Sequence, residues 1–154
     1  MKGWKTFRNA LIAIGLVVIA SLVAHFYVQS QVYYAVVNFT TPEGLNITAL
    51  LPETPDRSAC GAANERFLAP IKQQCKGCKV VMARCARQLE GLELALSQGD
   101  PLPHYQIAAV GLRLALVGPD GLAKAGCAQL AADLSGRGVR SAACISPGLA
   151  PAKP

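Results

Sequence analysis

The chain has 154 residues, of which 52% are hydrophobic, 16% charged and 6% aromatic. This length is typical of a single domain, and the apolar content excludes a disordered charged tail. The region after residue 28 carries twelve basic and nine acidic residues, so its net charge is only +3. Because this charge is weak and dispersed, we expect no nucleic-acid partner.

The apolar residues are concentrated near the N-terminus. Residues 10–28 include no Asp, Glu, Lys or Arg, and a helix of these 19 residues is long enough to cross a hydrocarbon core of about 30 Å. Three basic residues precede the segment and the next one is Arg57, so the positive-inside rule places the N-terminus in the cytoplasm. We therefore predict a cytoplasmic stub (1–9), a signal-anchor helix in the lipid bilayer (10–28), an extracytoplasmic domain (29–146) and a disordered proline-rich tail (147–154).

A signal peptide cleaved after Ala20 is the alternative, because small residues surround that position. The apolar run continues beyond it, which favours the uncleaved anchor.

All six cysteines follow the apolar segment, which points to an oxidising compartment and three disulfides. The composition, rich in alanine, glycine, leucine and arginine, is typical of bacteria. We therefore expect a single-pass inner-membrane protein with its domain in the periplasm.

The first predicted elements after the anchor form a β-hairpin, with strands over 32–41 and 45–51 and a Pro-Glu-Gly turn between them. Residues 62–73 carry apolar side chains at helical spacing, in a helix that Pro70 kinks or shortens. The run at 79–83 is then predicted to be a short buried strand.

Cys85 and three leucines at helical spacing indicate a second helix that ends near Gly99. Strands are predicted at 112–117 and 139–145, and a helix capped by Asp120 is predicted between them. The apolar run at 107–110, separated from the first of these strands by Gly111, is left open as a paired segment or a turn. The expected fold is mixed α/β (α+β), a hairpin followed by α-β-α-β-α-β. Strands that alternate with helices over short links predict a partly parallel sheet.

The lengths of these elements decide which cysteines can meet. Cys60 and Cys75 lie at opposite ends of a helix, about 20 Å apart, far beyond the Cα separation of about 7 Å that a disulfide allows. Similar distances separate Cys78 from Cys85 along a strand. We therefore predict the pairs Cys60–Cys85, Cys75–Cys78 and Cys127–Cys144.

The C-x-x-C motif at Cys75 and Cys78 raises the alternative of a membrane-tethered thiol-disulfide oxidoreductase. Redox motifs place the first thiol at a helix N-terminus, whereas this one follows a helix and precedes a strand, so a structural disulfide is favoured. Zinc ligation by the same cysteines requires free thiols, which an oxidising compartment opposes. We expect no metal and no cofactor.

A second alternative is a periplasmic ligand-binding module. Its candidate residues are Gly118, Asp120 and Gly121, which join a strand to a helix, together with His104 in a proline-rich loop. A turn with a helix cap and a surface histidine are the favoured explanations of these residues. The favoured hypothesis is a non-enzymatic accessory subunit that binds other envelope proteins, in polysaccharide, secretion or pilus assembly.

Overall fold

The computed structural model describes residues 15–24 and 32–151, which belong to two compact units divided after Gln31. In the first unit, residues 15–24 are helical and most of their apolar side chains are exposed. No helix within the described ranges is both long and apolar enough to cross a membrane. The predicted span over 10–28 lies partly outside these ranges, so it stays a prediction.

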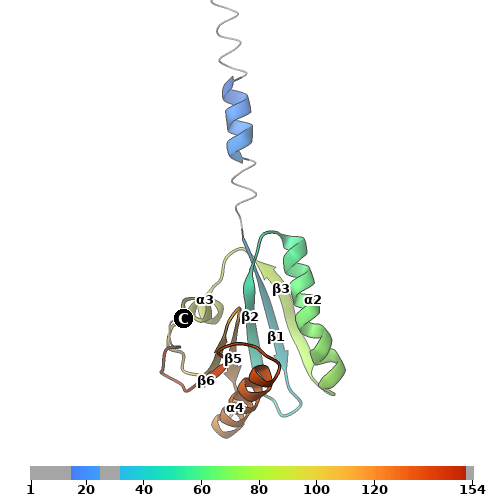
Figure 1. Cartoon of the computed structure of the whole chain (residues 1–154), viewed down its shortest axis with the longest axis vertical. Helices are drawn as coiled ribbons and strands as arrows, with labels where there is room; N and C mark the ends of the chain where they lie inside the picture. Colours follow the sequence, from blue (N-terminus) through green and yellow to red (C-terminus); the bar gives the residue numbers. More distant parts are fainter. Residues whose placement is uncertain (1–14, 25–31, 152–154) are drawn as a thin grey trace, which may run out of the picture. The chain divides into compact units, whose positions relative to one another are not determined.

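The second unit begins with the predicted hairpin (Figure 1). Strand β1 (Tyr33–Thr40) pairs antiparallel with β2 (Asn46–Thr54), and Val37 lies opposite Ala49. The turn between them is closed by two backbone hydrogen bonds, from the Thr41 N–H to the Leu45 carbonyl at 2.9 Å and from the Gly44 N–H to the Thr41 carbonyl at 3.0 Å. This antiparallel pairing confirms the hairpin prediction. The buried positions of both strands include the β-branched and aromatic residues on which the prediction rested, among them Val37, Phe39 and Ile47.

Four further strands extend the sheet: β3 (Lys79–Ala86), β4 (Tyr105–Ala109), β5 (Leu112–Val117) and β6 (Ala143–Ile145). Their order is β3-β1-β2-β5-β4-β6, and every neighbouring pair is antiparallel. The prediction of a partly parallel sheet was therefore wrong. The strands before and after the helix at 57–74, β2 and β3, run in the same direction, but β1 lies between them. In the same way, β4 lies between β5 and β6, the strands before and after the helix at 120–136.

The sheet contains the same topology twice. The segments β1-β2-helix-β3 and β4-β5-helix-β6 each place their first strand between the other two, and β2 and β5 meet at the centre of the sheet. Consequently, each half ends in an outer strand that has only one neighbour. These two edges are β3, with eight residues, and β6, with three.

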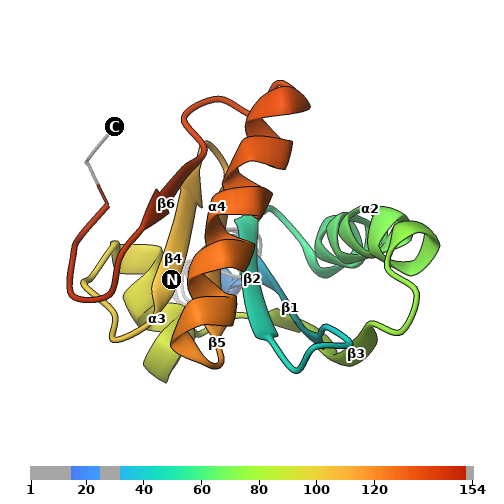
Figure 2. The same ribbon diagram turned by 90° about the horizontal axis from the view of Figure 1, so that it is seen from below.

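Helices α2 (Arg57–Gln74) and α4 (Asp120–Gly136) cover one face of the sheet, whereas α3 (Gly91–Gln98) packs against the other. Figure 2 shows α4 over the β4, β5 and β6 side and α2 over the β1 and β3 side. The larger core lies beneath α2 and α4 and includes Phe39, Ile47 and Leu116. A smaller core beneath α3 is centred on Leu96.

Several element boundaries differ from the prediction. Helix α2 starts at Arg57 because the Asp56 carboxylate accepts a hydrogen bond from the Ala59 backbone at 2.8 Å, and it continues past Pro70. Cys85 lies in β3 and not in a helix, and α4 is capped by Pro119 without a side-chain bond from Asp120.

The β3 strand is also not buried as predicted. Lys79, Val80, Val81 and Ala83 are exposed because this strand forms the edge of the sheet.

The predicted disordered tail is described as far as Pro151. Gly148 donates a backbone hydrogen bond to the Leu102 carbonyl at 2.8 Å, which places this segment against the α3–β4 connection. The last three residues lie outside the described ranges.

The structure contains the disulfides Cys60–Cys85, Cys75–Cys78 and Cys127–Cys144, the same pairs that the sequence predicts. Cys60–Cys85 joins α2 to β3, and Cys127–Cys144 joins α4 to β6. Both edge strands are thus covalently attached to the helix of their own half.

The three disulfides should differ in how much they stabilise the domain. The paired cysteines are 25, 17 and 3 residues apart in the sequence for Cys60–Cys85, Cys127–Cys144 and Cys75–Cys78. Loop-closure entropy then gives contributions of about 3.5, about 3 and about 1.5 kcal/mol. Double replacement of each pair by alanine should lower the free energy of unfolding in this order, as measured by urea denaturation. Equal losses for all three pairs would contradict the expectation.

Candidate functional site

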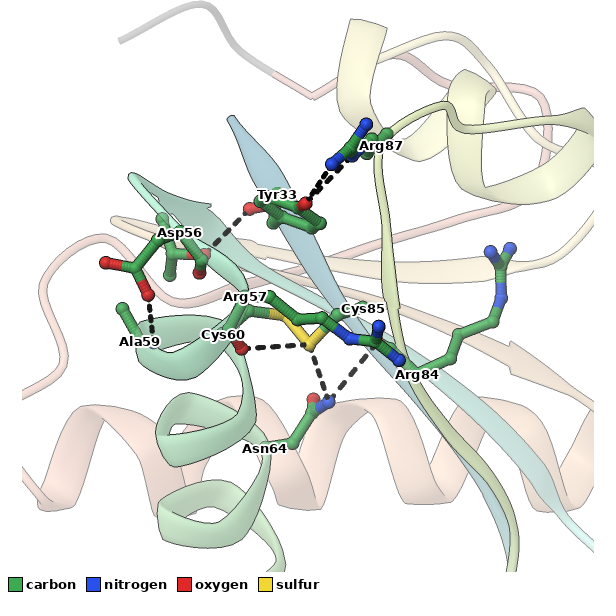
Figure 3. The surroundings of a disulfide bond; sticks show 10 residues. Tyr33, Asp56, Arg57, Ala59, Cys60, Asn64, Arg84, Cys85 and Arg87 are labelled. Atoms are coloured by element: carbon green, nitrogen blue, oxygen red, sulfur yellow. Dashed lines mark hydrogen bonds between the residues drawn. A yellow bond between two sulfur atoms is a disulfide. The ribbon is translucent and has the colours of Figure 1, made fainter. Parts of the chain in front are cut away.

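A disulfide and a cluster of polar contacts attach α2 to β3 (Figure 3). Cys60 is fully buried, and one helical turn later Asn64 donates a hydrogen bond from Nδ2 to the Arg84 carbonyl at 3.2 Å. The same amide nitrogen lies 3.8 Å from Cys85 Sγ. A covalent bond and a partly buried hydrogen bond therefore fix the first half of α2 to the second half of β3.

A second contact fixes the end of β3 to the start of β1. Arg87 follows β3, and its Nε and Nη2 atoms donate to the Tyr33 hydroxyl at 2.8 and 2.6 Å. The guanidinium carbon also lies 5.1 Å from the centre of the Tyr33 ring, within the range of a cation–π interaction. The pair is exposed, so its contribution is modest, but it adds to the restraint on β3.

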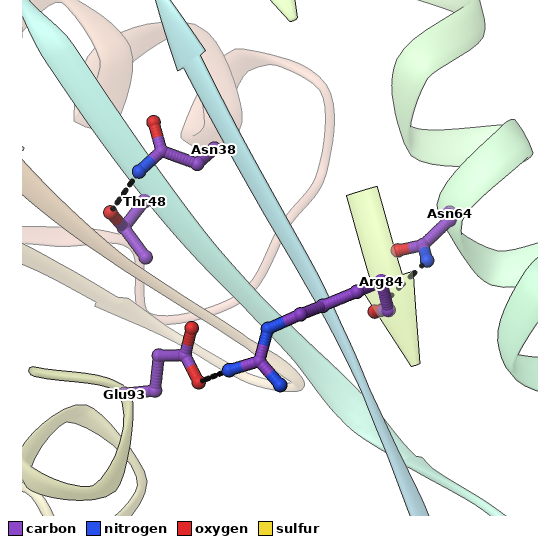
Figure 4. A network of polar contacts seen from close by, with 5 residues as sticks. All are labelled: Asn38, Thr48, Asn64, Arg84 and Glu93. Carbon is purple, nitrogen blue, oxygen red and sulfur yellow. Dashed lines mark hydrogen bonds and ion pairs between the residues drawn. The ribbon is translucent and has the colours of Figure 1, made fainter. Parts of the chain in front are cut away.

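On the face of the sheet opposite to α2, Arg84 forms an ion pair with Glu93 of α3 (Figure 4). The Glu93 side chain is largely buried and the Arg84 side chain is partly exposed. On the same face, Asn38 donates to the Thr48 hydroxyl at 3.4 Å, across the β1–β2 pair. Strand β3 is thus connected to α2 on one face of the sheet and to α3 on the other.

The C-x-x-C disulfide lies at the C-terminal end of α2, where Cys75 is the capping residue and its backbone donates to the Ile71 carbonyl at 2.9 Å. Gly77 within the motif has a φ of +96°, and a Cβ there would lie 3.0 Å from Pro42 Cγ in the β1–β2 turn. The motif therefore forms a compact turn that leads into β3. The described residues include no free cysteine.

The ligand-binding candidates lie around the start of α4, where the space near Gly118 is occupied. Leu45 from the β1–β2 turn packs there, and a Cβ at Gly118 would lie 3.0 Å from its Cδ1. Asp120 is in the first turn of α4 and places a carboxylate where an anionic ligand would bind. The close packing at Gly118 and the Asp120 carboxylate disfavour an anion beside Gly118, whereas the space at Gly121 is open. The ligand-binding hypothesis for Gly118, Asp120 and Gly121 stays a prediction.

His104 directly precedes Tyr105, a buried residue near Asp120. Burial raises the pKa of the Tyr105 hydroxyl above its usual value, and the charge of the Asp120 carboxylate and a hydrogen bond to it raise this pKa further. Tyr105, the first residue of β4, thus connects the sheet to Asp120 at the start of α4, and His104 lies next to this connection in the chain.

The structure also contains an open groove of about 720 Å³ that the sequence did not predict. Its walls are mainly apolar and come from the ends of β1 and β2, the β4–β5 turn and the segment around β6. At one side the Tyr34 hydroxyl donates to Glu53 at 3.0 Å, and this bond raises the pKa of Tyr34. The groove is formed by segments far apart in the chain, so local sequence patterns carry no signal for it.

Within residues 15–24 and 32–151, no group of three or more His, Cys, Asp or Glu side chains is placed to bind a metal ion. The four cysteines between 60 and 85 form two disulfides.

No protein-family model, characterised protein or solved structure is significantly similar to this chain.

Tyr105 should make the domain sensitive to alkaline pH. A tyrosine whose pKa is raised on folding keeps its proton more tightly in the folded state, so its contribution to stability is complete below the unfolded pKa of about 10. This contribution is lost as the pH rises from about 10 through the folded value. Between pH 9 and pH 11 the native protein should lose more thermal stability than Tyr105→Phe, as measured by circular dichroism. Equal losses would contradict the assignment.

The Cys75 thiol of the reduced motif should not be acidic. The negative end of the α2 dipole disfavours a thiolate at this position, and the lysines at positions 72, 76 and 79 only offset that effect. After selective reduction, alkylation of Cys75 followed by mass spectrometry should be half-maximal at about pH 8.5 or above. A midpoint below about pH 7.5 would instead support the oxidoreductase alternative.

Proposed function

We propose that this protein is a single-pass bacterial inner-membrane protein whose periplasmic domain binds other cell-envelope proteins. It acts as a non-enzymatic accessory subunit in envelope biogenesis, in polysaccharide, secretion or pilus assembly. The proposal depends most on one observation: disulfides attach both edge strands of the sheet to the covering helices. A fixed edge offers a binding surface that loses little conformational entropy when a partner binds.

The cysteines support the proposed compartment. All six are paired in the described domain, and disulfides of this kind persist in oxidising compartments such as the periplasm. Residues 10–28 supply the proposed anchor, which confines the domain to the membrane where an envelope assembly operates. Confinement raises the effective concentration of the domain near membrane-bound partners, so moderate affinity is sufficient for binding.

The contacts around the C-x-x-C motif favour this role over the oxidoreductase alternative. The motif follows α2, packs its glycine against the β1–β2 turn and leads directly into an edge strand. In this position the disulfide closes the turn before β3. This structural role is complete without any exchange with a substrate disulfide.

Crosslinking of the full chain in intact cells should capture other envelope proteins, which mass spectrometry can identify. A secreted form that begins at residue 29 should yield several-fold less of the same adducts, because the anchor no longer concentrates it at the membrane.

As a control, replacement of residues 10–28 by an unrelated transmembrane segment should preserve the adducts. Recovery of the full chain only as a monomer, without any adduct, would contradict the proposed function.

A further inference from the structure

Strand β3 is the long open edge of the sheet. Its eight residues pair with β1 on one side only, whereas the opposite edge, β6, has three residues. The Val80 and Val81 residues are adjacent and 40% and 64% exposed. An exposed edge with apolar side chains can pair with an additional extended strand, and soluble proteins usually protect such edges.

The protection of this edge is partial. The β1–β3 pairing shifts between Asn38 and Phe39, so Val81 has no partner on β1 and the strand contains an irregularity of the β-bulge type. Lys79 adds a positive charge at the start of the strand. Bulges and lysines hinder non-specific pairing between edges, but they leave the edge open to a partner that compensates the charge.

The charge of this edge has one sign. The segment 76–87 carries Lys76, Lys79, Arg84 and Arg87 and includes no acidic residue. Arg84 pairs with Glu93, and Arg87 binds the Tyr33 hydroxyl. Lys76 and Lys79 are exposed and form no ion pair with any residue in the described part of the chain. Lys76, in the turn before β3, and Lys79, the first residue of β3, therefore remain available to an acidic partner.

A second copy of the chain fits this edge poorly. Pairing of two β3 edges would bring together two segments that each carry Lys76 and Lys79 without an ion pair among the described residues, and that offer no acidic residue of their own. Like charges that face each other across neighbouring strands are destabilising. An extended segment with acidic residues matches both the open backbone and the lysines.

We infer that the β3 edge binds an extended acidic segment of a partner protein, which adds a strand to the sheet. This inference rests on the proposed function and names the surface and the chemistry of the partner. The backbone of the added segment pairs with the exposed first part of β3, residues 79–83, because the Arg84 carbonyl already accepts a hydrogen bond from Asn64. The acidic side chains of the segment face Lys76 and Lys79. The Cys60–Cys85 and Cys75–Cys78 disulfides hold the edge in position before binding.

The test uses a photoreactive amino acid at Val81 of the full chain, with Leu94 and Val110, two exposed residues outside β3, as comparison positions. After irradiation of intact cells, mass spectrometry identifies the crosslinked segment. Position 81 should capture a segment with a net negative charge. The double substitution K76E/K79E should lower the yield about tenfold, since it reverses both exposed charges.

The control is Lys124→Glu, which reverses an exposed charge on α4 and should leave the yield unchanged. Thermal unfolding of all variants verifies that the fold is intact.

Capture of a second copy, capture of a neutral or basic segment, or a yield that K76E/K79E does not lower would overturn the inference. Capture from Leu94 or Val110 but not from Val81 would overturn it while leaving the proposed function intact. Failure to capture a partner from any position would overturn both.

Discussion

The covalent attachment of the outer strands is the constraint on which the rest of this domain depends. An outer strand has a neighbour on one side only, so it forms about half as many backbone hydrogen bonds per residue to other strands as a central strand does. Strand β6, with three residues, has few ladder bonds to hold it. Cys127–Cys144 and Cys60–Cys85 connect each outer strand to the helix that precedes it, and the same arrangement occurs in both halves of the sheet.

The two edges nevertheless differ, and this asymmetry relates the fold to the proposed function. Strand β3 is long, exposed and apolar at Val80 and Val81, and it is held by Asn64, Arg84 and Arg87 in addition to its disulfide. A strand with this many restraints cannot adapt its shape to a partner. It suits a partner that is itself extended and that folds against it.

The sequence predicted features that depend on local patterns. The hairpin followed from β-branched residues around a turn, and the disulfide pairs followed from the lengths of the elements that separate the cysteines. The prediction of a partly parallel sheet was wrong because a hairpin strand inserts between the two strands that precede and follow a helix. This insertion depends on contacts between distant segments, which local sequence patterns do not reveal. The apolar run at 79–83 does not reveal whether a strand is central or at an edge, so the exposure of Val81 was missed. The groove beside β6 was missed because segments far apart in the chain form it.

Residue-resolved amide hydrogen exchange, before and after reduction of the disulfides, tests most directly whether covalent attachment holds the edges. In the oxidised protein, the amides of β3 and β6 that pair with their neighbours should be protected to a similar extent as those of β1 and β4. Reduction should accelerate exchange in β3 and β6 about a hundredfold, the equivalent of about 3 kcal/mol, and far less in the central strands β2 and β5. Unchanged exchange at the edges, or an equal increase in all six strands, would contradict the account.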